Sequence, residues 1–196
     1  MKHWGSVLSE EGFLENSAYA DAFDLIDRSD FLTDKYKKFS DVDEPVPIPF
    51  NQMQSAPHME AIFVNYGEPK EDQVVLEIGT GSGYLTAILS FLCRRVVTLE
   101  CIPELSKWAI TNISKYGRTN VDLLVGNINR VCLTRKFDLI ISTASFNSEP
   151  EFLKKLIVPD GRIIFPLGRF PPQRLIRYKN KKREELGSVS FVNIMD

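Results

Sequence analysis

The sequence is short of the residues that build metal centres, disulfide frameworks and membrane spans. It has three cysteines, an odd number without metal spacing, and two histidines, so we expect reduced thiols and no metal site. No apolar run approaches the roughly 18 residues of a membrane span. A net charge of −2 provides no basic surface for nucleic acid. We therefore expect a cytoplasmic protein that binds neither nucleic acid nor membrane.

The chain contains enough apolar residues to bury one hydrophobic core. Its 196 residues are 43% hydrophobic, which is ordinary for a globular protein. We expect a single domain that acts as a monomer. Within it, residues 1–44 should form an N-terminal helical extension. Residues 45–196 should form a substrate segment followed by a cofactor-binding sheet.

The first third of the chain predicts helices separated by an extended segment. Ser9 to Leu32 has amphipathic helical spacing and should form one helix that caps the domain. The alternating prolines of Pro45–Phe50 exclude helix and predict an extended chain. Ser55 followed by Pro57 indicates a helix start, with a capping hydroxyl and a proline in the first turn. That helix should cover residues 58–66.

From residue 73 onward the pattern alternates between strand and helix. This alternation predicts an α/β fold with a doubly wound, mainly parallel, seven-stranded sheet and a C-terminal antiparallel edge hairpin. Ligand residues should then follow the carboxyl ends of the strands. The expected strands are 74–78, 95–100, 121–125, 137–142, 162–166, 173–178 and 189–194, and the expected helices are 85–92, 103–116 and 149–156.

A glycine-rich bend follows the first of these strands. Its spacing is G-x-G-x-G, and Tyr84 occupies the last glycine position of the dinucleotide-binding pattern. Glu77 precedes the bend, and its carboxylate would repel a pyrophosphate but suits an ammonium group. S-adenosyl-L-methionine has an ammonium group, a sulfonium and no phosphate, so we expect it as the cofactor. The candidate binding residues here are Glu77, Gly79, Thr80, Gly81, Ser82 and Gly83.

Two later strand ends add further candidates for cofactor binding. Glu100 ends the second strand about 20 residues beyond the bend, where an acidic side chain accepts both ribose hydroxyls of a nucleoside. Cys101 should then pack against the adenine. Gly126 and Asn127 follow the third strand, and the Asn127 amide oxygen can accept from the adenine amino group. The simpler alternatives are a solvated carboxylate at Glu100 and a plain turn residue at Asn127.

Three segments together resemble the protein-L-isoaspartate O-methyltransferase family. They are Gln52-x-x-Ser55-x-Pro57-His58-Met59, the glycine motif at residues 75–84, and Pro166-Leu167-Gly168. The glycine motif alone is similar to any class I methyltransferase with a Rossmann-like fold. The Ser-x-Pro-His-Met segment is what selects this family.

The resemblance implies a carboxyl O-methyltransferase that repairs damaged proteins. Its acceptor would be the α-carboxylate of an isoaspartyl residue in a peptide or protein, and its cofactor product would be S-adenosyl-L-homocysteine. By the same resemblance, Ser55 would be the catalytic serine that touches the acceptor. The implied substrate-binding residues are Gln54, Pro57, His58, Leu167 and Gly168.

A carboxylate acceptor also agrees with the shortage of general bases, among which Glu60 stays open as a candidate. A carboxyl group with a pKa of about 4 is ionised at pH 7 and needs no base, whereas a phenol, thiol or amine usually has to lose a proton before it can be methylated. Met53, Asn127 and Phe146 depart from the family pattern. They leave open a class I methyltransferase with another acceptor, or a non-catalytic module that binds the cofactor. Glu77 disfavours a nicotinamide dehydrogenase.

Overall fold

Seven strands form one sheet in the order β5-β4-β3-β6-β7-β8-β9 in the computed structural model, which describes residues 2–195. The strands from β3 to β7 run parallel to their neighbours, and β8 and β9 add antiparallel pairs at one edge. This arrangement confirms the predicted fold class. The strands are β3 (Val74–Ile78), β4 (Arg95–Glu100), β5 (Val121–Val125), β6 (Phe137–Ser142), β7 (Ile157–Leu167), β8 (Gln173–Lys179) and β9 (Lys182–Val189).

The centre of the sheet is β3, all five residues of which are buried. The chain goes first to β4 and β5 on one side of β3 and then to β6 and β7 on the other. Ligands bind in α/β sheets at the carboxyl ends of strands beside such a reversal. The geometry therefore places the site after β3, β4 and β6.

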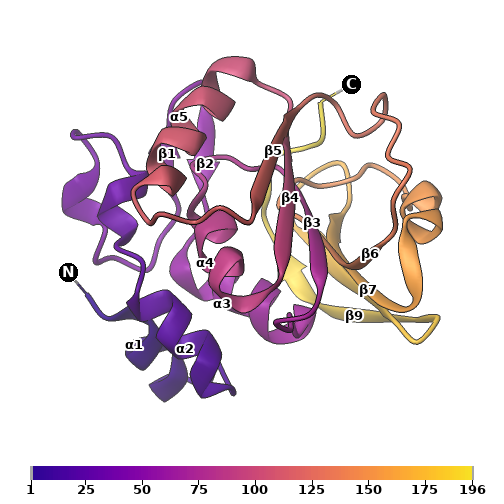
Figure 1. Cartoon of the computed structure of the whole chain (residues 1–196), viewed down its shortest axis with the longest axis horizontal. Helices are drawn as coiled ribbons and strands as arrows, with labels where there is room; N and C mark the ends of the chain where they lie inside the picture. The colour runs from indigo at the N-terminus through magenta and orange to yellow at the C-terminus, as the bar shows by residue number, and fades with distance from the viewer. Residues whose placement is uncertain (1, 196) are drawn as a thin grey trace.

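Three α-helices lie on the same side of the sheet, as Figure 1 shows. They are α3 (Pro57–Gly67), α4 (Tyr84–Leu92) and α5 (Pro103–Ser114). The other apolar face is covered by loops and by the 3-10 helix η3 (Glu151–Lys155), whose Leu153 is fully buried. The prediction of an α-helix for residues 149–156 is therefore wrong, because these residues form a short 3-10 helix, which is wound more tightly than an α-helix.

The N-terminal extension is broken into short helices rather than one. They are α1 (Trp4–Glu10), α2 (Ser17–Asp24) and the 3-10 helices η1 (Arg28–Phe31) and η2 (Lys37–Phe39). The predicted continuous helix from Ser9 to Leu32 is wrong, because Gly12 adopts φ +81° and Asn16 caps a new helix by accepting from the Ala18 amide. Figure 1 shows α1 and α2 packed together at the N-terminal end of the molecule. Their apolar faces join the core that contains α4.

A short hairpin connects the extension to α3. Its strands are β1 (Val46–Ile48) and β2 (Gln52–Gln54). The extended chain predicted for residues 45–50 is confirmed over β1. The predicted capping role of Ser55 is wrong, because the N-cap residue is Ala56, whose side chain cannot accept a hydrogen bond. Asp43 supplies the acceptor instead, at 3.0 Å from the His58 amide nitrogen.

The C-terminal hairpin turns earlier than its apolar pattern predicts. Asn180 and Lys181 have φ of +52° and +62°, so the chain reverses there and the charged residues that follow form β9. The strand predicted for residues 189–194 is wrong. The charged residues before it form the strand instead, because charged side chains are well tolerated on an exposed edge strand. Residues 190–195 instead return toward the carboxyl ends of the central strands, where they line two cavities.

Between Lys2 and Met195 no helix combines the length and apolar character needed to cross a membrane. The same residues contain no group of three or more His, Cys, Asp and Glu side chains placed to hold a metal ion. All three cysteines are free thiols; Cys93 is buried, and Cys101 and Cys132 are exposed.

Candidate functional site

Two adjoining cavities lie at the carboxyl ends of β3, β4 and β6. The first, called the Glu100 cavity, has a volume of about 80 Å³ and is lined by the ends of β4 and β5 and by the C-terminal residues. The second, called the Ser55 cavity, has a volume of about 380 Å³ and reaches the start of α3. Both are lined by Met53, Gly79, Gly81, Thr143 and Val192. A ligand can therefore extend from one cavity into the other.

The three glycines of the bend have different structural roles. Gly79 adopts φ +96°, and a Cβ there would lie 2.5 Å from Thr143 Oγ1. Gly81 adopts φ +57°, and a Cβ there would meet the protein only at ordinary van der Waals distance, 3.7 Å from Ile48 Cδ1. Gly83 caps α4 outside both cavities, and a Cβ there would lie 2.8 Å from Ile113 Cγ1. Only the first two lie where a ligand would bind.

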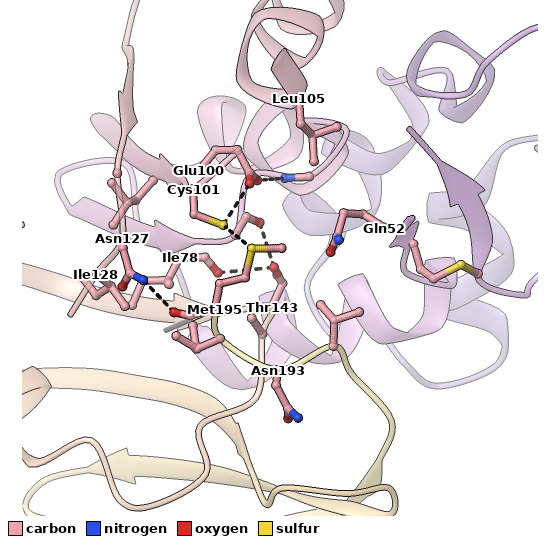
Figure 2. Close-up of a pocket in the computed structure, with 18 residues that line it drawn as sticks. Gln52, Ile78, Glu100, Cys101, Leu105, Asn127, Ile128, Thr143, Asn193 and Met195 are labelled. Carbon is pink, nitrogen blue, oxygen red and sulfur yellow. Dashed lines mark hydrogen bonds between the residues drawn. The ribbon is translucent and has the colours of Figure 1, made fainter. Parts of the chain in front are cut away.

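The Glu100 carboxylate is fixed at the end of β4 by backbone amides. Its Oε2 accepts from the Gly81 amide at 2.9 Å, and its Oε1 accepts from the Ile102 amide at 3.0 Å. Figure 2 shows the carboxylate on the wall of the Glu100 cavity, next to Cys101. Oε2 keeps a free lone pair, and Oε1 also accepts from the Cys101 thiol at 3.6 Å, a weak bond that a ligand hydroxyl can replace.

Asn127 holds the C-terminal segment over the Glu100 cavity. Its Nδ2 donates to the Met195 carbonyl at 2.6 Å, and its Oδ1 accepts from the Asn129 amide at 2.8 Å. Figure 2 shows the Met195 side chain between Cys101 and Thr143, with its sulfur 3.6 Å from the Cys101 sulfur. The Met195 side chain is thus part of the lining of this cavity. Gly126 is needed beside it, because a Cβ there would lie 2.7 Å from Val131.

Three residues that line the Ser55 cavity each carry a buried polar atom without a partner among residues 2–195. The atoms are Glu60 Oε2, Glu77 Oε1 and the Tyr84 hydroxyl. The other Glu77 oxygen accepts from the Thr86 hydroxyl of α4. A buried polar atom without a hydrogen bond costs about 1–3 kcal/mol, so three of them on residues that line one cavity indicate a place for a ligand.

Burial changes the ionisation of both carboxyl groups in this cavity. It raises the pKa of Glu77 to about 7, and the Thr86 and Thr98 hydroxyls only partly oppose it. It also raises the pKa of Glu60 to about 8, and the neighbouring Glu77 adds to that rise. The physical cause in both cases is the loss of water around a charged group. Both groups therefore hold protons at higher pH than an exposed glutamate would.

The predicted residues Thr80 and Ser82 also line the Ser55 cavity and are buried. The Thr80 hydroxyl is 2.7 Å from that of Thr98 on β4, and Ser82 Oγ accepts from the Tyr84 amide at 3.3 Å. Ser55 itself is half-buried on the same wall. The structure thus brings the predicted serine and most of the predicted cofactor residues together.

Gln54 and Pro57 belong mainly to the framework of the site. With its amide oriented by its neighbours, Gln54 donates to the Phe31 carbonyl at 2.8 Å and accepts from Arg28 Nε at 3.2 Å. Gln54 also lines the Ser55 cavity, but its polar atoms are engaged by the fold. Pro57 is buried in the first turn of α3.

Three other predicted substrate residues lie outside both cavities. His58 points away from them, with its Nδ1 atom 2.9 Å from Asp43 Oδ2. Leu167 and Gly168 lie at the end of β7, where the Gly168 amide donates to the Phe146 carbonyl at 2.8 Å. Phe146 is itself buried and packs against Phe165, so its departure from the family pattern affects the core.

The spacing of sequence motifs did not identify two important parts of this site. The first part is Glu60 and Tyr84, each of which has a buried polar atom without a partner. The sequence signal for Glu60 is that a charged residue lies on the apolar, buried face of α3. Arg28 is 1% exposed, and its guanidinium donates to the carbonyls of Val42 at 2.7 Å, Glu44 at 2.8 Å and Ser55 at 3.2 Å. It thereby ties the N-terminal extension to the segment that carries Ser55.

The chemistry of the lining favours a nucleoside without phosphate and with a cationic end. Neither cavity is lined by Lys, Arg or His from the described residues, so neither offers a cation to a phosphate. The fixed carboxylate of Glu100 suits a ribose diol, and the unpaired oxygen of Glu77 suits an ammonium group. The missing side chain at Gly81 leaves room for the ligand to approach the backbone.

Comparison with known proteins agrees with this geometry. The family model described as protein-L-isoaspartate(D-aspartate) O-methyltransferase matches residues 3–196. A protein-L-isoaspartate O-methyltransferase of Pyrococcus abyssi is 36% identical, with 96% of this chain and 91% of the relative covered. One from Myxococcus xanthus is 34% identical, with 98% and 95% covered.

A solved structure shares the fold. It is described as a protein-L-isoaspartate O-methyltransferase from Plasmodium falciparum in complex with S-adenosyl-L-homocysteine. The TM-score is 0.86 at 24% sequence identity, and the match covers 100% of this chain and 99% of that one. At that identity the likeness concerns the fold alone.

Proposed function

The chain belongs to the protein-L-isoaspartate(D-aspartate) O-methyltransferase family, and we propose from this that it methylates the free carboxylate of isoaspartyl residues in damaged proteins. The methyl donor is S-adenosyl-L-methionine. The observation that carries the proposal for this chain is the Ser55 cavity. It joins the glycine bend to the Ser-x-Pro-His-Met segment through shared walls.

The cofactor would be held along both cavities. The carboxylate of Glu100 would accept from the ribose hydroxyls, and Cys101, Gly126 and Asn127 would surround the base. The unpaired oxygen of Glu77 would face the amino-acid end of the cofactor. When bound, S-adenosyl-L-methionine supplies an electrophilic methyl group on its sulfonium.

The acceptor would enter the Ser55 cavity from the surface beside α3. A further hollow of about 540 Å³ is lined by His58 and by Pro171, and it shares Pro45, Met59 and Ser190 with the Ser55 cavity. A peptide can lie in this hollow while one side chain reaches inward. In this arrangement His58 would contact the peptide rather than the reacting carboxylate.

Catalysis in this site would rest on orientation and on exclusion of water. An isoaspartyl carboxylate is ionised at neutral pH, so no residue has to remove a proton. Ser55 would hydrogen-bond the acceptor carboxylate and hold it toward the methyl group. Correct orientation of two reactants can lower a barrier by about 7–11 kcal/mol, which is sufficient for a displacement without a general base.

The deciding experiment uses the purified protein, S-adenosyl-L-methionine with a labelled methyl group, and a peptide that contains one isoaspartyl residue. We expect a base-labile methyl ester on that peptide. The control is the same sequence with an ordinary aspartyl residue, which should remain unlabelled. Cofactor binding without any ester on the isoaspartyl peptide would exclude this acceptor.

We further propose that the enzyme works as a monomer in the cytoplasm, without a nucleic-acid partner. The small net charge supports the last point. Sedimentation at micromolar concentration, with and without isoaspartyl peptide, tests the first. A stable dimer under both conditions would contradict it.

A further inference from the structure

Glu60 is an acidic side chain buried where the reacting groups are expected to meet. It is 4% exposed in the first turn of α3 and lines the Ser55 cavity together with Ser55 and Glu77. Its Oε2 atom has no hydrogen-bond partner among the described residues. A side chain that lines a ligand cavity and has a carboxyl oxygen that no protein group satisfies is available to bond the ligand.

The Ser55 cavity has to accept negative charge without a cation on its wall. If the proposed function holds, one carboxylate comes from the amino-acid end of the cofactor and another from the isoaspartyl residue. The nearest cation is Arg28, which lies behind the cavity wall. Its Nη1 and Nη2 atoms donate to backbone carbonyls, and its Nε donates to Gln54. Arg28 therefore has no N–H left for a ligand.

Ligand carboxylates must then be stabilised by neutral donors. The side chains that can donate from the wall are hydroxyls, including those of Ser55 and Tyr84, and the carboxyl group of Glu60 when it carries a proton. An ionised Glu60 would repel the same ligand. We propose that Glu60, as a neutral acid, donates a hydrogen bond to a carboxylate of the bound ligands and so makes ligand binding depend on pH.

The surroundings of Glu60 keep the proton on this group. Burial and, to a smaller extent, repulsion by Glu77 of β3 raise its pKa, Arg28 of η1 and the Ser55 hydroxyl lower it, and the net result is a pKa of about 8. Tyr84 of α4 also faces it, and burial raises the pKa of that phenol. The carboxyl group is therefore mostly neutral at pH 7 and ionised by pH 9.

The test compares the wild type with Glu60→Gln, which donates through an amide at every pH. Affinity for S-adenosyl-L-homocysteine and the KM for an isoaspartyl peptide are measured at pH 6.5 and pH 9. At pH 9 about a tenth of Glu60 remains protonated, so wild-type binding should weaken about tenfold. Glu60→Gln should change by less than about threefold over the same range. Glu104→Gln, an exposed first-turn residue of α5, is the matched control and should behave as wild type.

A second ligand identifies which carboxylate is bound. Methylthioadenosine lacks the amino-acid end of the cofactor, so its affinity should not depend on residue 60. If the cofactor carboxylate is the partner, the pH effect appears in S-adenosyl-L-homocysteine binding. If the acceptor is the partner, the effect appears in the peptide KM alone. Either result supports the proposal, and melting temperatures confirm that each variant is folded.

Two results would overturn the inference. One is an identical pH dependence in the wild type and Glu60→Gln for both ligands. The other is weaker binding of S-adenosyl-L-homocysteine by Glu60→Gln at pH 6.5, which would mean that a carboxylate charge is needed there. Binding without methylation of the peptide would reject the proposed acceptor while the cofactor measurement still decides the role of Glu60. A wild type that binds no S-adenosyl-L-homocysteine would reject both proposals.

Discussion

The Gly81 amide donates to Glu100 Oε2 at 2.9 Å, which joins the glycine bend after β3 to the end of β4. This bond fixes the carboxylate beside the Glu100 cavity before any ligand arrives. The Ile102 amide holds the other oxygen at 3.0 Å. A group that is already oriented loses little entropy on binding, so we expect this pair to be central to cofactor affinity.

Replacement of Glu100 should therefore weaken cofactor binding more than it changes stability. Glu100→Gln exchanges one acceptor oxygen for an amide donor, which faces the amide of Gly81 or Ile102. Hydrogen bonds to charged groups contribute about 1.5–3 kcal/mol, so S-adenosyl-L-homocysteine affinity should fall roughly 10- to 100-fold. Calorimetry measures it. Glu184→Gln on the exposed strand β9 is the control, and equal affinities in the two variants would contradict this role.

Substitutions at two glycines of the bend should separate binding from folding. Gly81→Ala adds a Cβ that clashes with no protein atom but takes up space on the wall of both cavities, so it should abolish cofactor binding at a stability cost of about 1–2 kcal/mol for its positive φ. Gly83→Ala forces a Cβ against Ile113 and should cost about 1–3 kcal/mol more. Urea unfolding and calorimetry on both variants test this. If Gly81→Ala binds the cofactor as tightly as the wild type, the cofactor does not bind against Gly81, and the prediction is contradicted.

Ser55→Ala should lower turnover without loss of stability. The Ser55 side chain does not cap α3, so its removal leaves the helix start intact. If the hydroxyl holds the acceptor, kcat for an isoaspartyl peptide should fall at least about tenfold, which is the loss of one hydrogen bond in the transition state. Affinity for S-adenosyl-L-homocysteine should stay within a factor of about three. Equal losses of both quantities would assign Ser55 a merely structural role.

Glu60 should make the stability of the fold depend on pH. Its folded-state pKa of about 8 lies above the ordinary value of 4.5, so the folded state holds a proton that the unfolded state releases. This contribution to stability is complete below pH 4.5 and is lost as pH rises through about 8. Between pH 6 and pH 9 the wild type should lose more free energy of unfolding than Glu60→Gln, by about 1–3 kcal/mol. Urea unfolding measures both proteins at both pH values, and an equal loss of unfolding free energy in the wild type and Glu60→Gln would contradict the prediction.

Arg28 should be essential for the position of the Ser55 segment. Arg28→Met leaves several carbonyls and Gln54 without donors in a buried region, so stability should fall by at least about 3 kcal/mol. Arg28→Lys should recover little of this loss, since a single ammonium group cannot reach all the acceptors that surround the planar guanidinium of Arg28. Thermal unfolding measures both variants. A melting temperature for Arg28→Met within about 2 °C of wild type would refute this assignment.

The central elements were predictable because their signals are local. The strand bounds of β3, β4, β5 and β6 match the predicted ranges residue by residue. Each is a short apolar run closed by a turn or charged residue, which is the pattern expected of strands in a parallel sheet, although the edge strand β5 is only partly buried. The mainly parallel sheet and the location of Glu77, Gly81 and Glu100 at the carboxyl ends of its strands follow from the alternation of strand and helix.

The predictions failed where a distant segment decides a local conformation. The helix expected from Ser9 to Leu32 breaks because its two halves, α1 and α2, fold back against each other, and α2 also packs on α4 and α1 on α3. Ser55 does not cap α3, because Asp43 reaches the same helix end from the extension. Leu167 and Gly168 lie outside both cavities because Phe146, 21 and 22 residues earlier in the sequence, draws them toward the core.

The sequence by itself determined the sheet, the glycine bend and the type of ligand, because these depend on residue spacing and on the charge of Glu77. Only the tertiary structure decided that Glu60, Glu77, Ser55 and Tyr84 share one cavity and that Arg28 is fully engaged behind it. Burial and hydrogen-bond satisfaction depend on every neighbour in space, and no short stretch of sequence contains those neighbours.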